Sequence, residues 1–283
     1  MHGRPAALFG SIEGVLMGND TMGNETNDRR IKRAAVIVAA GKGLRAGTDV
    51  PKQYLPVGGR PMLCHSVETF LEVGANPVVI VVPAGDEDYV REKILPQMVL
   101  PHNAESGAPK TAERIIIVPG GAERHDSVYE GLKACSNSDC VWIHDAARPF
   151  VTPEILGAAM TAAEECGAAV PVVPVKDTIY VRAGGADDNG GAEEAGAFLA
   201  DIPARDSLCA AQTPQTFRTE LILRAHEWYR GLRGAEKSAL KVTDDAMLAR
   251  AVGAEVKLVP GSPANLKVTT PEDIEYLREG GGL

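Results

Sequence analysis

Three short apolar runs rich in β-branched residues, separated by segments with helical spacing, constrain what this chain can fold into. The runs are Ala34–Ala40, Pro77–Pro83 and Cys140–His144. Strands that alternate with helices along a chain are typical of an α/β protein with a parallel, doubly wound sheet. Ligands of such sheets bind at the carboxyl ends of the strands, where the connecting loops gather. Because the first and third runs end in unusually polar loops, the sequence predicts the functional site there.

The chain is long enough for one large domain. Its 283 residues are 45% hydrophobic, which allows a sizeable core without disulfides. We expect residues 1–31 to be a poorly ordered extension and residues 32–283 to form the folded domain. The apolar stretches are shorter than the roughly 20 residues that a membrane helix needs, so we expect no membrane partner.

Charge and cysteine content narrow the choice of partners. The chain has 38 acidic and 29 basic residues and a net charge of −9, which argues against nucleic acid as the main partner. A phosphate-bearing ligand must then be bound by a local basic site. The five cysteines form no Cys-x-x-Cys pair and lie in or beside apolar runs, which favours reduced core thiols and a cytoplasmic location. They are Cys64, Cys135, Cys140, Cys166 and Cys209.

The segment after the apolar run Val170–Val175 predicts an excursion from the main domain. Residues 183–197 are rich in glycine and acidic side chains and cannot bury a core. The short runs Thr178–Arg182 and Phe198–Pro203 flank them. We therefore expect a hairpin-like arm over residues 172–207, with a flexible acidic tip at 183–197.

The loop after the first run has the composition of an anion-binding loop. It reads A-A-G-K-G-L-R-A, and its glycines let backbone N–H groups close around a phosphate. The spacing also fits the dinucleotide fingerprint G-x-G-x-x-G/A. That fold needs an acidic residue about 20 positions later, but Pro51 cuts in early and residues 61–66 contain no acid. A dinucleotide-dependent oxidoreductase is therefore the weaker interpretation.

Two cations accompany these glycines. Arg45 lies in the loop itself, and Lys52 follows in the motif P-K-Q-Y-L. Cations beside a glycine loop suit a triphosphate, because phosphoryl transfer spreads negative charge over the phosphate oxygens. A single loop cation is more often simply solvated, but the combination with the strand and the glycines favours a binding role.

The third run ends in the motif H-D-A-A-R-P. Asp145 in this motif suits Mg²⁺, which prefers one or two carboxylates together with phosphate oxygens. Asp145 could instead cap a helix that begins near Thr152, or pair with Arg148. His144 is expected to be a core or supporting residue, and the six histidines show no zinc-ligand spacing.

Eight motifs, taken in order, resemble the 2-C-methyl-D-erythritol 4-phosphate cytidylyltransferase family of the non-mevalonate isoprenoid pathway. They are A-A-G-x-G-x-R, P-K-Q-Y-L, G-G-x-E-R-x-D-S-V, H-D-A-A-R-P, V-K-D-T, T-P-Q-x-F, T-D-D-A and N-L-K-V-T-T-P-E-D. Each motif alone is modestly specific, but eight in the correct order over residues 34–277 are highly specific. The resemblance implies a Rossmann-like nucleotidyltransferase domain and a protruding β-arm that mediates homodimerisation. It also implies a Mg²⁺-dependent transfer from CTP to the sugar-alcohol phosphate, with release of pyrophosphate, although other divalent ions remain possible.

Carried over by position, the resemblance also implies roles for individual residues. The triphosphate loop falls on Ala39, Ala40, Gly41, Gly43 and Arg45. Catalysis falls on Lys52, Lys267 and Arg45, and the metal on Asp145. Contacts with the cytosine and ribose fall on Gly121, Arg124, Ser127 and Ala146. Those with the sugar phosphate fall on Arg148, Thr178, Arg205, Thr213 and Thr243, of which Thr178 and Arg205 reach the partner's active site.

The expected chemistry needs no general base. The attacking group is a phosphate monoester with a second pKa near 6, so it is largely dianionic at neutral pH. Positioning and electrostatics should then suffice. Two alternatives stay open: a pentitol-phosphate (ribitol 5-phosphate) cytidylyltransferase, and a non-catalytic nucleotide-binding module on the same fold. The motif H-D-A-A-R-P and the C-terminal N-L-K-V-T-T-P-E-D favour the isoprenoid enzyme over the first alternative.

Overall fold

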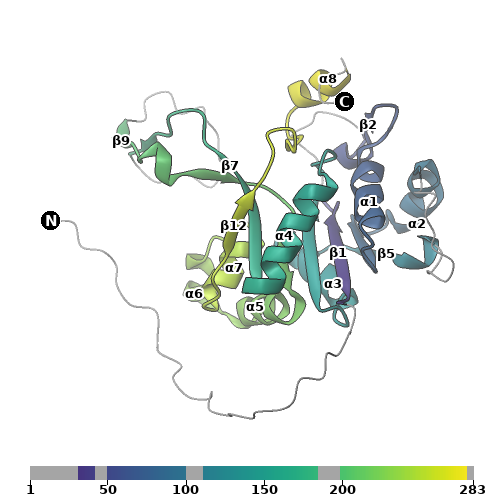
Figure 1. Ribbon diagram of the computed structural model, residues 1–283, viewed down its shortest axis with the longest axis horizontal. Coiled ribbons are helices and arrows are strands. Elements are labelled where there is room, and N and C mark those ends of the chain that lie inside the picture. The colour runs from purple at the N-terminus through teal and green to yellow at the C-terminus, as the bar shows by residue number, and fades with distance from the viewer. Residues whose placement is uncertain (1–30, 42–49, 100–110, 184–197, 279–283) are drawn as a thin grey trace, which may run out of the picture. The chain divides into compact units, whose positions relative to one another are not determined.

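The described part of the chain folds around a central sheet of eight strands, whose place among the helices is seen in Figure 1. The strands follow the order β10-β7-β11-β6-β1-β4-β5, and β12 also pairs with β7. The three predicted runs form the strands that pair in parallel at its centre. The strands are β1 (Arg33–Val38), β4 (Val78–Val82), β5 (Ile115–Pro119), β6 (Cys140–Asp145), β7 (Ala168–Pro174), β10 (Cys209–Ala211), β11 (Gln215–Arg218) and β12 (Lys257–Pro260).

The computed structural model describes residues 31–41, 50–99, 111–183 and 198–278. Residues from Ile31 onward form one unit of the chain. The predicted N-terminal extension lies outside the described residues apart from Ile31, and so does the predicted arm tip apart from Ala183.

The predicted doubly wound sheet is confirmed with one difference, because the sheet is mixed and has antiparallel strands at one side. β11 runs antiparallel to both β6 and β7, and β10 runs antiparallel to β7. A parallel return needs a long crossover connection, usually a helix. In the described part of the chain between β7 and β10 there is no α-helix. The chain therefore returns to the sheet in the opposite direction.

Helices cover both faces of the sheet. On one face α1 (Met62–Glu72) and α4 (Pro153–Cys166) share a core with Ala35 and Ile37 of β1. On the other face α3 (Arg124–Ala134), α5 (Thr219–Gly231) and α7 (Asp245–Ala251) share a core with Ala34 and Val36. Because successive side chains of a strand point to opposite faces, a strand covered on both sides reads as a continuous apolar run.

The smaller elements complete the described chain. They are the strand pair β2 (Pro56–Val57) and β3 (Arg60–Pro61), the strand pair β8 (Val181–Arg182) and β9 (Leu199–Asp201), the helices α2 (Glu87–Tyr89), α6 (Gly234–Ala239) and α8 (Pro271–Arg278), 3₁₀ turns at Lys52–Tyr54, Leu95–Gln97, Thr111–Arg114 and Arg205–Ser207, and a π-helical turn at Val90–Ile94.

The two short runs on either side of the predicted arm tip form a strand pair. β8 and β9 pair antiparallel, with Val181 opposite Asp201. From Lys176 to Ser207 every described side chain is exposed except the half-buried Pro203. Large apolar side chains are among them: Ile179, Tyr180, Val181, Phe198, Leu199 and Ile202, of which Phe198 is 81% exposed.

The five cysteines are free thiols, and the prediction of core positions holds for three of them. Cys64, Cys135 and Cys140 are buried, whereas Cys166 and Cys209 are exposed. Cys166 is the last residue of α4 and Cys209 opens the short strand after the arm, so both lie at element ends beside the core.

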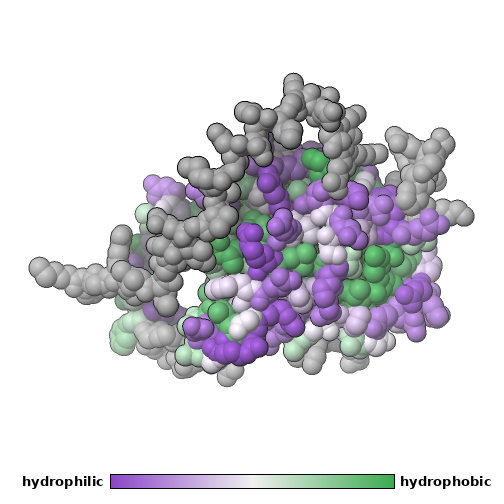
Figure 2. All heavy atoms as spheres, turned by 90° about the horizontal axis from the view of Figure 1, so that it is seen from below, coloured by the Kyte–Doolittle hydropathy of each residue, from purple (hydrophilic) through white to green (hydrophobic). Residues whose placement is uncertain are grey.

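On the face drawn in Figure 2, hydrophilic and hydrophobic side chains are interspersed. Within the described residues, no helix has the length and apolar character required to cross a membrane.

Candidate functional site

A cavity of about 460 Å³ opens where β1 and β6 end side by side. It lies at the carboxyl ends of the parallel strands, where ligands of doubly wound sheets bind. A larger cavity, of about 780 Å³, lies near the start of β6 and involves Asp139, Cys140 and Arg218. Because that cavity is at the amino ends of the strands, the smaller one is the candidate site.

The loop motifs at the end of β1 are joined to one another. The buried side chain of Gln53 donates from Nε2 to the carbonyl oxygen of Ala39, at 2.7 Å. The neighbouring Lys52 donates from Nζ to the carbonyl oxygen of Val268, at 3.1 Å. The two motifs P-K-Q-Y-L and N-L-K-V-T-T-P-E-D therefore meet at the cavity although they are far apart in the sequence.

Two glycines at the cavity, Gly121 and Gly41, differ in the space that a side chain would have. A Cβ on Gly121 would overlap the Cβ of Asp126, so this turn needs glycine to bring the start of α3 close. A Cβ on Gly41 would meet no atom within 4 Å. Packing of the described chain therefore does not require glycine at position 41. A backbone without a side chain here suits the close approach of a ligand.

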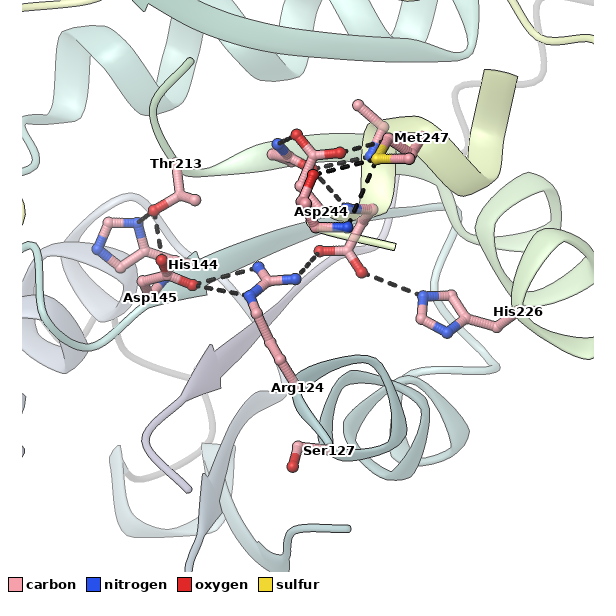
Figure 3. Close-up of polar contacts among 12 residues, drawn as sticks. Arg124, Ser127, His144, Asp145, Thr213, His226, Asp244 and Met247 are labelled. Atoms are coloured by element: carbon pink, nitrogen blue, oxygen red, sulfur yellow. Dashed lines mark hydrogen bonds and ion pairs between the residues drawn. The ribbon is translucent and has the colours of Figure 1, made fainter. Parts of the chain in front are cut away.

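Asp145 is held between two cations from distant segments, and Figure 3 shows the pairing with Arg124. Nε and Nη2 of Arg124 each donate to Oδ1 at 3.2 Å, and Nζ of Lys267 donates to Oδ2 at 2.6 Å. Burial alone would raise the pKa of Asp145, but the charges of Arg124 and Lys267 outweigh it and hold the pKa well below its usual value. The carboxylate is therefore ionised at neutral pH.

The two structural alternatives for Asp145 are wrong. Thr152 occupies the N-cap position of α4. The Arg148 guanidinium donates from Nη1 to the carbonyl oxygen of Asn265, at 2.7 Å. Asp145 is left to interact with Arg124 and Lys267 at the cavity.

His144 lies beneath Asp145 as a supporting residue, as predicted. Its Nε2 is 3.0 Å from the carbonyl oxygen of Arg148, and its Nδ1 is 3.0 Å from Oγ1 of Thr213. The same Thr213 oxygen accepts from the backbone N–H of Asp145 at 3.1 Å. Burial lowers the pKa of His144 to about 4, so the ring is neutral and supports the Asp145 backbone through Thr213.

Sequence reasoning missed the residues behind Arg124. Its Nη1 donates to Oδ2 of Asp245 at 2.8 Å, and Oδ1 of Asp245 lies 3.2 Å from Nε2 of His226. Figure 3 shows Arg124 between Asp145 and the carboxylate that contacts His226. The second acid of T-D-D-A was a signal for Asp245. His226 stands on an ordinary helix and gave none.

The structure brings ten of the predicted site residues together around the cavity. They are Ala39, Ala40, Gly41, Lys52, Gly121, Arg124, Ser127, Asp145, Ala146 and Lys267. Gly43 and Arg45 lie outside the described residues.

The remaining predicted residues do not line the cavity. Arg148 and Thr213 lie next to it, in the network beneath Asp145. Oγ1 of Thr178 accepts from Nη2 of Arg205 at 2.9 Å, which pairs these two residues on the exposed arm. The exposed Thr243 contacts the sulfur of Met247. Neither residue of this arm pair is among the described residues that line the cavity.

The described residues contain no cluster of three or more His, Cys, Asp or Glu side chains that could hold a metal ion. A metal at this cavity would therefore rest on the single carboxylate of Asp145. Such a site fits Mg²⁺, which commonly takes one carboxylate and completes its shell with phosphate oxygens and water.

Comparison with known proteins agrees with the resemblance. The family model described as IspD, 2-C-methyl-D-erythritol 4-phosphate cytidylyltransferase, matches residues 33–278. A protein of Alkaliphilus oremlandii with the same enzyme name is 40% identical over 251 residues, covering 88% of this chain and 94% of that protein.

Two solved structures are similar over nearly their whole length. The 2-C-methyl-D-erythritol 4-phosphate cytidylyltransferase of Thermus thermophilus aligns with a TM-score of 0.65 and 30% identity, covering 89% of this chain and 100% of that one. The 4-diphosphocytidyl-2C-methyl-D-erythritol synthase of Anaerococcus prevotii aligns with a TM-score of 0.67 and 30% identity, covering 88% and 98%.

Proposed function

The chain belongs to the 2-C-methyl-D-erythritol 4-phosphate cytidylyltransferase family, and we propose that it transfers the cytidylyl group of CTP to 2-C-methyl-D-erythritol 4-phosphate. The products are 4-diphosphocytidyl-2-C-methyl-D-erythritol and pyrophosphate. The observation that carries the proposal is the cavity at the ends of β1 and β6, where Lys52, Lys267 and Asp145 lie together beside the bare backbone of Gly41.

The nucleotide half of the reaction is supported by the charges at this cavity. Backbone N–H groups at Gly41 and the ammonium groups of Lys52 and Lys267 can surround a triphosphate. We place Arg45 with them by sequence, since the A-A-G-K-G-L-R-A loop begins at the end of β1. Together they stabilise the negative charge that moves onto pyrophosphate as it leaves.

The chemical step then depends on placing two anions in line. One oxygen of the sugar phosphate attacks the α-phosphorus of CTP and forms the new P–O bond, while the bond to pyrophosphate breaks. The attacking phosphate is already dianionic at neutral pH, so no residue has to remove a proton. The lowered pKa of His144 makes it a weak base, and the carboxylate of Asp145 is paired with Lys267, so both fit this absence of base chemistry.

We further propose that Mg²⁺ binds at Asp145 together with oxygens of the nucleotide phosphates. When bound, the ion would neutralise phosphate charge. Asp145→Asn tests the assignment, because an amide is a weaker ligand for a hard cation than a carboxylate. We expect at least about a hundredfold loss of turnover and a higher half-saturating Mg²⁺ concentration. An unchanged metal requirement would contradict the assignment.

We also propose that the arm completes the site of a second copy in a homodimer. Thr178 and Arg205 are paired on the exposed arm, and the arm carries a set of exposed apolar side chains. Large exposed apolar patches commonly mark protein interfaces. Phe198→Asp should therefore shift the protein toward monomers in sedimentation equilibrium, and an unshifted dimer would place the interface elsewhere.

A pyrophosphate-release assay tests the main proposal. The protein is incubated with each of the four nucleoside triphosphates and with either 2-C-methyl-D-erythritol 4-phosphate or ribitol 5-phosphate. We expect turnover with CTP and the methylerythritol phosphate. Preferred use of ribitol 5-phosphate would support the pentitol-phosphate alternative, and binding of CTP without turnover would support a non-catalytic module.

A further inference from the structure

A chain of polar side chains leads from the cavity into the core. It runs from Asp145 through Arg124 and Asp245 to His226 (Figure 3). Asp245 has no exposed surface and His226 is 1% exposed. Burying ionised groups is costly unless each is closely paired. The two inner residues do not line the cavity, so a role for them must act through Arg124.

Arg124 meets its two carboxylates with different atoms. Nη1 contacts Asp245, whereas Nε and Nη2 contact Asp145. A guanidinium is planar, and its donors lie in a fixed fork. Fixing Nη1 on Asp245 therefore also fixes the plane in which Arg124 meets Oδ1 of Asp145.

Asp245 is itself held from three elements. It stands at the start of α7, and its backbone N–H and that of Ala246 donate to Oε1 of Gln215 in β11, both at 2.9 Å. Its Oδ1 contacts His226 of α5. Burial would raise the pKa of Asp245, but the charge of Arg124 and the hydrogen bond with His226 lower it. Asp245 is therefore a fixed negative charge.

We propose that Asp245 is a positioning residue that orients Arg124 and takes up part of its charge, so that Asp145 keeps the charge with which it binds a divalent cation. This inference rests on the proposed function, since it takes Asp145 as the ligand. Without the charge of Asp245, Arg124 would pair with Asp145 alone. Asp145 would then face both Arg124 and Lys267 with its charge fully compensated, and it would bind a cation more weakly.

Asp245→Asn tests the proposal, because asparagine has nearly the same shape and no charge. Binding of Mn²⁺ is measured by electron paramagnetic resonance in the presence of CTP and without acceptor. We expect about tenfold weaker Mn²⁺ binding, the lower end of what loss of a group behind a metal ligand costs. In turnover, the half-saturating Mg²⁺ concentration should rise by a similar factor, while KM for the sugar phosphate stays within about twofold.

Asp244→Asn is the matched control. This neighbouring carboxylate accepts from the backbone N–H of Met247 at 3.0 Å and from Nε2 of Gln215 at 2.8 Å, so it stabilises α7 rather than orienting Arg124. We expect a lower melting temperature and an unchanged Mn²⁺ affinity. Equal weakening of Mn²⁺ binding in both variants would reduce Asp245 to a structural role and overturn the proposal.

His226→Leu covers the case in which Asp245→Asn does not fold. It keeps the charge of Asp245 but removes the contact that holds Oδ1, and we expect about threefold weaker Mn²⁺ binding. The proposal is wrong if Mn²⁺ binding is as tight as in the parent protein in each of the two variants, Asp245→Asn and His226→Leu, that folds. Parent protein that binds Mn²⁺ and CTP without transferring the nucleotide would contradict the proposed reaction instead, and the binding comparison would still decide the role of Asp245.

Discussion

At the scale of single residues, the site depends on side chains that meet across long sequence separations. Asp145 receives Arg124 from 21 positions away and Lys267 from 122 positions away. The sequence predicted each residue as a member of a motif. It did not predict that Arg124 would bridge two carboxylates, because Asp145 and Asp245 belong to other motifs that only the fold brings to Arg124.

Lys52 is the residue whose removal should separate chemistry from folding. Lys52 is half-buried at the start of the 3₁₀ turn Lys52–Tyr54, and its ammonium contacts a backbone carbonyl at the cavity. We expect Lys52→Ala to lower kcat by about a thousandfold or more, because it removes charge stabilisation of the transition state. The melting temperature should change by only a few degrees.

Lys52→Arg separates geometry from charge at the same position. A planar guanidinium cannot occupy the place of a compact ammonium beside a crowded phosphorus. We therefore expect this variant to recover only a small part of the lost turnover. Near-native kcat in Lys52→Ala, measured by pyrophosphate release, would remove Lys52 from the mechanism.

His144 should give the protein a distinct pH dependence of stability. Its pKa is about 4 when folded and 6.5 in the reference state. Between these values the unfolded chain binds a proton that the folded protein does not, so the free energy of unfolding falls as pH is lowered from about 6.5 to 4. The full effect is about 3 kcal/mol.

His144→Gln should flatten that slope, since glutamine keeps a donor toward the Arg148 carbonyl but does not titrate. The measurement is urea unfolding of nucleotide-free protein in a chelator at several pH values. The difference between parent and variant cancels the contribution of other groups. Asp145 and Asp245, whose pKa values are lowered, lose their stabilising effect only at more acidic pH. Parallel slopes in the two proteins would contradict this role of His144.

At the scale of elements, the central strands were predictable because burial on both faces makes them continuous apolar runs. Strand β11 was not predictable, since Gln215–Arg218 is short and only Phe217 in it is apolar. Its antiparallel direction follows from the return of the arm, which is a property of a long connection and not of its own residues. The helix α3 begins at Arg124, three residues after Gly121.

Substitutions at two helical glycines should separate the effect of core packing on stability from that of helix propensity. A Cβ on Gly131 of α3 would lie 2.5 Å from Cγ1 of Val36, whereas one on Gly157 of α4 would meet nothing within 4 Å. Alanine gains about 1 kcal/mol of helix propensity over glycine, but overpacking a tight core typically costs about 1–3 kcal/mol. We expect Gly131→Ala to destabilise the protein by about 1–2 kcal/mol and Gly157→Ala to stabilise it by about 0.5–1 kcal/mol. Chemical denaturation of both variants checks the signs, and stabilisation by both would mean that α3 can move away from β1.

At the scale of the whole molecule, the predicted site residues of one chain fall into two separate groups. The described residues that are predicted to bind the nucleotide line one cavity, whereas Thr178 and Arg205 pair on the exposed arm. Sequence motifs identify which residues share a function but carry no information on which copy supplies each of them. The division is explained if two chains exchange arms, since a two-fold interface would give each cavity the arm of its partner.

Mixing two damaged proteins tests this arrangement. Lys52→Ala impairs the cavity, and Arg205→Ala should raise KM for the sugar phosphate far more than KM for CTP, because it removes charge-assisted contacts with one ligand. In a dimer of one chain of each kind with exchanged arms, one site receives both changes and the other receives neither. Random exchange between equal amounts of the two proteins would restore about a quarter of the sites. The mixture is assayed at sugar phosphate concentrations below KM, where each variant alone is nearly inactive. Chain exchange is verified separately with differently tagged proteins, and exchange without recovered activity would mean that each site is built within one chain.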